Sequence, residues 1–176
     1  DLIRRGNEVC GVDCASRMIA QFRGKLSGLP AASRKRMEFL RGDAENLLLG
    51  RRLFDACLIV RTLSHIKNTG KLFAEVYRVL RPKGVMVIAD LHHKHSYKYT
   101  VLKDPHSERR VPVITYKRDL RDYGKILKKL GFKRESYKKL AYSDLRWQPR
   151  RGDEFKSIMA NSDKPIFFVA KFSKVK

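Results

Sequence analysis

Two acidic residues that each follow a short apolar stretch are the first candidates for chemistry. Asp13 ends "NEVCGVD" and Asp43 ends "MEFLRGD", and Asp90 ends a third such stretch. A carboxylate that ends a strand of an open α/β sheet lies where ligands bind, and it accepts hydrogen bonds from ribose hydroxyls. Aspartate is also a common turn or cap residue, and for Asp13 alone the two interpretations are balanced. Two acids that end neighbouring strands favour a nucleoside pocket.

The segments around these acids alternate between strand and helix patterns. We expect strands at 7–13, 37–43, 54–60 and 84–90. The stretch 54–60 is almost continuously apolar, which is typical of a strand covered on both faces. Helices capped by Ser16 and Asn68 separate the strands, and the first carries Met18 and Ile19 on its apolar face. This order predicts an α/β fold: a Rossmann-like, doubly wound, mostly parallel sheet with helices on both faces.

The pattern changes after Asp90. We expect a β-hairpin around "DPHSERR", then a helix in "RDLRDYGKILKKLGF" that ends at Gly131, and a final strand in "KPIFFVAKF". A single domain over residues 1–176 accommodates all of these elements. In it, residues 1–91 would be a partial cofactor-binding part and residues 92–176 the substrate-side part.

Composition places the chain in a broad class. It has 176 residues, 43% of them hydrophobic, and a formal net charge of +22 that is spread along the chain and is higher after residue 91 than before it. Such a charge suits RNA or another polyanion, but equally a solvated basic surface. No apolar run reaches the roughly 20 residues that span a bilayer. The three cysteines lack zinc-ligand spacing and favour a reducing compartment, so we expect a cytoplasmic protein.

Four blocks, taken in order, carry a resemblance to a known family. They are "EVCGVDCASRMI", "EFLRGDAENL", "LFDACLIVRTLSHI" and "YRVLRPKGVMVIAD". Together they resemble class I S-adenosylmethionine-dependent methyltransferases, most of all the branch that acts on small molecules and lipid-like quinones. The resemblance covers Val9 to Phe172 and is weaker after Asp90. It implies S-adenosylmethionine as the cofactor and methyl transfer by in-line displacement at a sulfonium carbon.

The resemblance assigns roles within the first two blocks. Asp13 matches the acid that holds the ribose hydroxyls, and Cys14 and Met18 match residues that pack against the adenine. Asp43 matches the acid that accepts from the adenine amino group, and the backbone amide of Ala44 would meet a ring nitrogen. The Gly-Asp-Ala turn would thus read the base of the cofactor.

Later segments match the part of the family's site that faces the methionine moiety and the acceptor. Arg61 would border the cofactor and His65 would line the substrate pocket, although a loop histidine without such a role is the alternative. His93 and His95 are candidate general bases, because histidine titrates near neutrality. A structural role is the alternative for each of them. Tyr97 begins the expected hairpin, which would form a lid, and could line the acceptor pocket.

A metal site is not expected. His92, His93 and His95 lie close together, but no acid or cysteine joins them at ligand spacing.

The first strand and the glycine-rich loop of the family should precede Val9, and this sequence does not contain them. We therefore expect an incomplete reading frame rather than a degenerate protein. A sheet that lacks its central strand has two unpaired edges, so we expect this chain on its own to self-associate.

The resulting hypothesis is an S-adenosylmethionine-dependent methyltransferase that acts on a small-molecule acceptor. An RNA-directed methyltransferase is the alternative that the net charge favours. A non-catalytic binding module on the same fold is the alternative that the missing loop favours. A nicotinamide dehydrogenase would also use Asp13 on a ribose, but the sequence Gly-Asp-Ala-Glu argues against it.

Overall fold

The computed structural model of the chain describes residues 2–92, 100–103, 110–113, 115–116, 118–144 and 163–175. These residues fall into two compact units, Asp1–Leu49 and Gly50–Lys176. The single domain over residues 1–176, with its two parts meeting after residue 91, stays a prediction.

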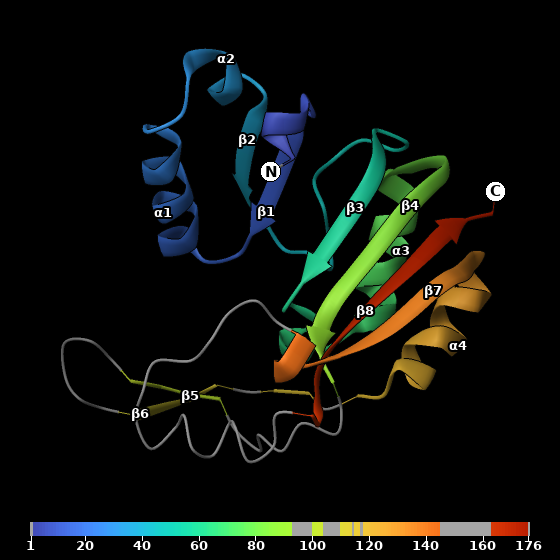
Figure 1. Ribbon diagram of the computed structural model, residues 1–176. Helices are drawn as coiled ribbons and strands as arrows, with labels where there is room; N and C mark the ends of the chain where they lie inside the picture. The colour runs from blue at the N-terminus through green and yellow to red at the C-terminus, as the bar shows by residue number, and fades with distance from the viewer. Residues whose placement is uncertain are drawn as a thin grey trace. The chain divides into compact units, whose positions relative to one another are not determined.

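The first unit is a pair of parallel strands joined by helices. β1 (Val9–Asp13) pairs with β2 (Met37–Arg41), and α1 (Ser16–Leu26) followed by the short α2 (Ala31–Arg34) connects them (Figure 1). This confirms the order of strand, helix and strand expected from the sequence. A 3-10 turn, η1 (Ile3–Arg5), precedes β1.

Aromatic packing connects α1 with β2. Phe22 of the helix and Phe39 of the strand stack with their ring centroids 5.0 Å apart. Gly11 of β1 lies against the same ring, and a Cβ atom there would lie 2.5 Å from Phe39, so a larger residue would have to displace this ring. Ile19 is buried as expected, whereas Met18, expected on the same apolar face, is 41% exposed.

The second unit contains a four-stranded sheet with the order β3-β4-β8-β7. β3 (Phe54–Val60) and β4 (Leu80–Leu91) are parallel, and α3 (Thr69–Val79) is the crossover between them. β8 (Pro165–Lys174) pairs antiparallel with β4 on one side and with β7 (Phe132–Ala141) on the other. Mixed pairing of this kind places the last strand of the chain inside the sheet.

α3 and α4 (Leu120–Leu130) pack against each other on one face of this sheet. Phe73 of α3 and Tyr123 of α4 meet edge to face with their ring centroids 5.8 Å apart. The strands contribute a row of buried residues that are neighbours in the sheet register: Ile59, Met86, Ile88, Phe168, Ala170 and Phe172. This row and the two helices form the core of the second unit.

β3 is less buried than the sequence predicts. Leu58 and Val60 are 51% and 58% exposed, whereas Ile59 between them is buried. The reason is that β3 is the first strand of the sheet order, and α3 and α4 pack on the face that carries Ile59. The expectation that this strand is covered on both faces is therefore wrong.

The predicted hairpin is confirmed in outline. β5 (Thr100–Lys103) and β6 (Arg110–Val113) pair antiparallel, and β6 begins at Arg110, the last residue of the expected turn "DPHSERR". β7 matches none of the strands predicted from the sequence, and α2 matches none of the predicted helices. None of the helices in the part of the chain that the structure describes is long and apolar enough to span a membrane.

Candidate functional site

The parallel pairing of β1 and β2 brings two predicted site residues to one edge of the first unit. Asp13 is the last residue of β1 and pairs with Arg41, the last residue of β2. The N–H of Gly42 donates to the carbonyl of Asp13 at 3.1 Å, which extends the pairing to the residue before Asp43. The two acids thus follow neighbouring strands at the same carboxyl edge, where open α/β sheets bind their ligands.

Local backbone groups orient both carboxylates. Asp13 Oδ1 accepts from the N–H of Ala15, and Asp43 Oδ1 accepts from the N–H of Glu45, each at 2.8 Å. Both are bonds to the residue two positions ahead, the usual way in which aspartate fixes a turn. Within residues 2–49, the structure gives the second oxygen of each carboxylate no hydrogen-bond partner. Each acid therefore presents a charged acceptor that a ligand donor can use.

The start of α1 differs from the prediction. Ser16, expected to cap the helix, is its first residue, and the cap position is taken by Ala15, which makes no side-chain bond. Asp13 orients the start of the helix instead, because its carboxylate accepts a hydrogen bond from the Ala15 N–H and fixes the turn that leads into α1. The acid that ends β1 thus shapes the loop beside it.

The other residues predicted to meet the nucleoside lie next to these acids in the chain. Cys14 follows Asp13 and is exposed, and Met18 lies in the first turn of α1. Ala44 follows Asp43 and is half-buried. The roles of Cys14, Met18 and Ala44 toward an adenine stay predictions.

In the second unit, a buried carboxylate organises the loop that follows β3. Asp90, near the end of β4, is 2% exposed, and its Oδ2 accepts from the N–H groups of Thr62 and Leu63 at 2.9 and 2.8 Å. Arg61 precedes them with φ +49°, which is uncommon for a residue other than glycine. Its N–H donates to the carbonyl of Ala89 at 2.9 Å. The turn at Arg61 is therefore fixed from both sides by β4.

A second segment ties down the same loop. The guanidinium of Arg118 donates to the carbonyl of Ile66 at 2.7 Å and to that of Lys67 at 2.5 Å. The N–H of Tyr116 donates to the carbonyl of Ser64 at 2.7 Å, and the Arg118 guanidinium lies over the Tyr116 ring. The residues that lead into α4 thus hold residues 64–67 in place.

Sequence reasoning assigned no role to Asp90 or to Arg118. The signal for Asp90 was present, because it ends an apolar strand as Asp13 does. Arg118 had no such signal, because its acceptors are backbone carbonyls 52 and 51 residues away along the chain.

The pKa of Tyr123 reflects the burial of the side chains around Asp90 and Arg118. Burial, and then the nearby Asp90 carboxylate, raise the pKa of Tyr123 to about 12, although the Arg118 guanidinium acts in the opposite direction. The phenol is therefore neutral at physiological pH.

The remaining predicted residues fall into two groups. His65 ends the 3-10 turn η2 (Leu63–His65) and is exposed, so it is accessible to a ligand. His93, His95 and Tyr97 lie outside the residues that the structure describes. Their proposed roles stay predictions, as does the role of Arg61 beside a cofactor.

Comparison with known proteins identifies relatives by sequence. A methyltransferase from Mycobacterium leprae named for phthiotriol and phenolphthiotriol dimycocerosates is 38% identical over 73 residues, 42% of this chain and 24% of that protein. Its counterpart from Mycobacterium ulcerans is 36% identical over 91 residues, 52% of this chain and 27% of that protein. The chain thus spans about a quarter of the length of these curated relatives.

Comparison with solved structures supports the fold. A crystal structure of an S-adenosylmethionine-dependent methyltransferase from Methanosarcina mazei matches 99% of this chain and 85% of its own, with a TM-score of 0.72 and 17% identity. This confirms the predicted α/β, Rossmann-like fold. A family described as "Methyltransferase domain", which uses S-adenosylmethionine, matches residues 1–88. Because this match covers half of the chain, the chain belongs to that methyltransferase family.

Proposed function

We propose that this chain is part of an S-adenosylmethionine-dependent methyltransferase and that its first unit recognises the nucleoside of the cofactor. One observation carries the proposal. The pairing of β1 with β2 places Asp13 and Asp43 after neighbouring strands, and one oxygen of each carboxylate is held by the backbone while the other has no partner within residues 2–49. Two oriented acceptors on adjacent strands suit a ligand that carries donors at two separate points.

Different residues of the first unit would bind different parts of the nucleoside. Asp13 would accept from the ribose hydroxyls and Asp43 from the exocyclic amine of adenine, with the Ala44 amide at a ring nitrogen. Cys14 and Met18 would pack against the base. The hydrogen bonds to Ala15 and Glu45 fix the acids before the ligand arrives, which lowers the entropy cost of binding.

When bound, S-adenosylmethionine supplies a methyl group on an already activated sulfonium. The work left to the chain's residues is to align the acceptor and exclude water. Arg61, in its fixed turn, would border the cofactor, and His65 and Tyr97 would line the acceptor pocket. His93 and His95 would take a proton only if the acceptor must lose one.

For the acceptor, we propose a small, lipid-like molecule. The support is the sequence similarity to the two mycobacterial methyltransferases named for phthiotriol and phenolphthiotriol dimycocerosates. We also propose a reducing, cytoplasmic location, which the free thiols of Cys10, Cys14 and Cys57 support.

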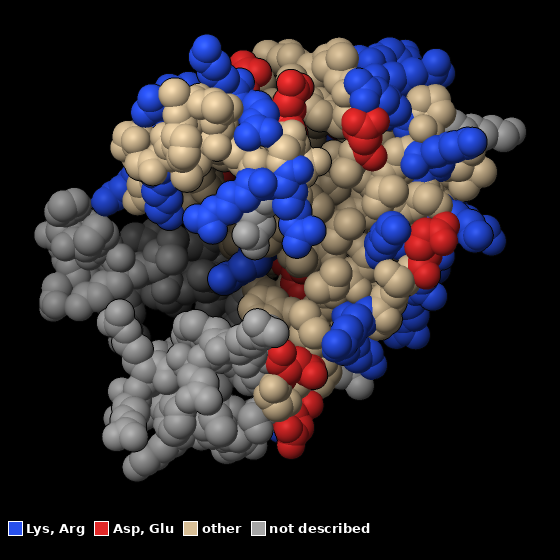
Figure 2. All heavy atoms as spheres, turned by 45° about the horizontal axis from the view of Figure 1, so that its top comes forward, with Lys and Arg blue, Asp and Glu red and all other residues tan. Residues whose placement is uncertain are grey.

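RNA is the second candidate acceptor, and the charge of the chain is the observation that favours it. The formal net charge is +22, and Figure 2 shows Lys and Arg side chains over much of the face in view, with fewer Asp and Glu among them. Binding to RNA driven by this charge would weaken steeply with salt. Titration of the chain with a single-stranded RNA at several salt concentrations separates this candidate from a small-molecule enzyme.

The test of the nucleoside site is calorimetric titration of the chain with S-adenosylhomocysteine. Asp43→Asn keeps an oxygen for the Glu45 N–H but puts an NH₂ group where the adenine amine would donate. A lost hydrogen bond to a charged group is worth about 1.5–3 kcal/mol, so the Kd should rise by roughly 10- to 100-fold.

Glu38→Gln provides the matched control, because Glu38 is an exposed acid near the start of β2 rather than at its carboxyl end. It should leave the Kd unchanged. An equal effect of the two substitutions, or an unsubstituted chain that does not bind the nucleoside, would refute the proposal.

A further inference from the structure

A groove of about 720 Å³ in the second unit is lined mainly by residues of α4, β7 and β8. Figure 1 shows these three elements next to one another. Its volume falls in the range of roughly 300–1,000 Å³ that is usual for small-molecule sites. Its lining includes none of the residues proposed for the nucleoside or the acceptor. The apolar part of that lining consists of Leu120, Leu127, Phe132, Phe172 and Val175.

A glycine inside α4 leaves part of this groove open. Gly124 lines the groove in the middle of the helix, where glycine is less favourable than alanine. A Cβ atom built at Gly124 would meet no neighbouring atom within 4 Å. Packing therefore does not require glycine here, and a larger side chain would project into the empty space.

The rim of the groove is positively charged. Lys128 of α4 and Lys133 and Arg134 of β7 belong to its lining, and no acidic residue does. Lys133 Nζ lies 4.0 Å from Glu135 Oε1, which is long for an ion pair. Glu135 Oε1 also accepts from the hydroxyl of Ser173 at 2.6 Å, so this carboxylate is already engaged.

We propose that this groove binds a long-chain fatty carboxylate. The acyl chain would lie on the apolar floor, where each methylene removed from water contributes to binding. The carboxylate would sit at the rim, where Lys128, Lys133 and Arg134 can donate charge-assisted hydrogen bonds. A neutral lipid would leave the cations unused, and a polyanion such as RNA would leave the apolar floor unused.

One electrostatic effect opposes this arrangement. The C-terminal end of a helix carries a partial negative charge, and α4 ends beside the groove at Gly131. Two features reduce the effect: the N–H of Gly131 donates to the carbonyls of Leu127 and Lys128, and Lys128 and Lys129 lie in the last turn. Full charges at the rim outweigh the remaining partial charge.

Calorimetric titration of the chain with oleate, below its micelle concentration, tests the proposal. Oleate should bind, and oleyl alcohol should bind at least roughly tenfold more weakly because it lacks the charge. Gly124→Leu fills the groove and should abolish oleate binding. Gly124→Ala should retain most of it while raising the melting temperature, because alanine favours the helix.

A pair of double variants tests the role of the positive charges at the rim. The double substitution Lys128→Glu with Lys133→Glu should weaken oleate binding by at least roughly tenfold. Lys125→Glu with Lys138→Glu changes the net charge equally at exposed positions of α4 and β7 that do not line the groove, and should leave binding unchanged.

Equal losses in the two pairs would overturn the proposal, as would oleyl alcohol binding as tightly as oleate. Binding to anionic lipid vesicles that survives Gly124→Leu, without binding of free oleate, would assign the charge to a membrane surface and also overturn it. If Gly124→Leu fails to give the thermal transition of the parent chain, the two charge pairs decide.

Discussion

At the scale of single residues, a buried lysine connects the last strand with the end of α3. Lys174 is only 6% exposed, and its Nζ donates to the carbonyls of Tyr77 and Leu80 at 2.7 and 2.9 Å. It also lies over the Tyr77 ring, 4.1 Å from the centroid. Burial, followed by the charges of Arg52 and Arg51, lowers the pKa of Lys174. The last strand thus caps the end of α3 through one ammonium group.

Lys174→Met should destabilise the chain. It leaves the carbonyls of Tyr77 and Leu80 without their buried donor, and an unsatisfied buried group costs about 1–3 kcal/mol. Urea denaturation gives the free energy of unfolding. Lys171→Met removes an exposed lysine from the same strand and should change that free energy little. Equal losses from the two substitutions would contradict the capping role.

Tyr123 should make the fold sensitive to alkaline pH. Because burial raises its pKa from 10.0 to about 12, the folded chain retains a proton that the unfolded chain loses between these values. The contribution to stability is complete below the unfolded pKa and is lost as pH rises through the folded one. Two pKa units correspond to about 2–3 kcal/mol.

The measurement is urea denaturation of the parent chain and of Tyr123→Phe across this alkaline range. Phenylalanine cannot ionise, so the variant should lose less stability as the pH rises. Parallel declines of the two proteins would show that other groups cause the alkaline loss.

At the scale of elements, the sequence predicted strands and helices where the hydrophobic pattern was strong and failed where charge hid it. β1, β2, β4 and β8 end or run in apolar stretches, and all were predicted. β7 was missed because five of its ten residues are charged. These charges suit its position, since β7 is the last strand of the sheet order and lysines protect an edge from further pairing.

The residues of the candidate site also differ in how well the sequence predicts them. Asp13 and Asp43 could be predicted because each ends its own strand, so local pattern determines their position. The loop at Arg61 could be placed after β3, but not the groups that hold it. Asp90 could be placed at the end of a strand, as Asp13 could, but its backbone contacts lie 28 and 27 residues away. Side-chain patterns carry no information about such contacts, and the same holds for Arg118.

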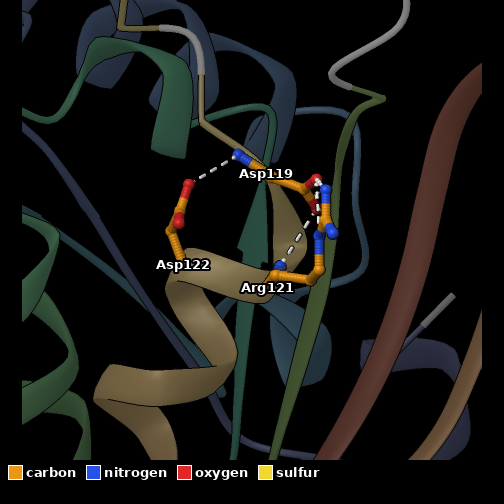
Figure 3. Close-up of polar contacts among 3 residues, drawn as sticks. All are labelled: Asp119, Arg121 and Asp122. Carbon is orange, nitrogen blue, oxygen red and sulfur yellow. Dashed lines mark hydrogen bonds and ion pairs between the residues drawn. The ribbon is translucent and has the colours of Figure 1, made fainter.

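The capping box of α4 allows a prediction about a single element. Asp119 accepts from the N–H of Arg121 at 3.0 Å, and Asp122 accepts from the N–H of Asp119 at 3.2 Å (Figure 3). Asp119→Ala should cost about 1 kcal/mol of stability, because the cap is lost. Asp119→Asn keeps a capping oxygen and loses the ion pair with Arg121, whose side chain is 87% exposed, so it should cost less.

Thermal or urea unfolding of the two Asp119 variants measures this difference. A larger loss for asparagine than for alanine would show that the ion pair, rather than the cap, stabilises the start of α4.

At the scale of the whole molecule, the two edge strands of the four-stranded sheet differ in chemistry. β7 exposes Lys133, Lys138 and Lys139 along its length. β3 exposes Leu58 and Val60, and the only charged residue within it is Asp55, near its start. An apolar, uncharged strand edge is a template for pairing with another chain, whereas a lysine-rich one resists it. We therefore expect β3 to be the contact in the self-association that the sequence predicts.

The chain should accordingly form dimers or larger species as its concentration rises, and light scattering coupled to size-exclusion chromatography measures this. Leu58→Lys with Val60→Lys should shift it toward the monomer, because two charges would have to be buried when two β3 edges meet. Leu53→Lys is the control: Leu53 is 46% exposed directly before β3, outside the strand, and should leave the association unchanged. A parent chain that stays monomeric at high concentration, or a control that dissociates it as well as the double variant does, would show that the β3 edge is not the contact.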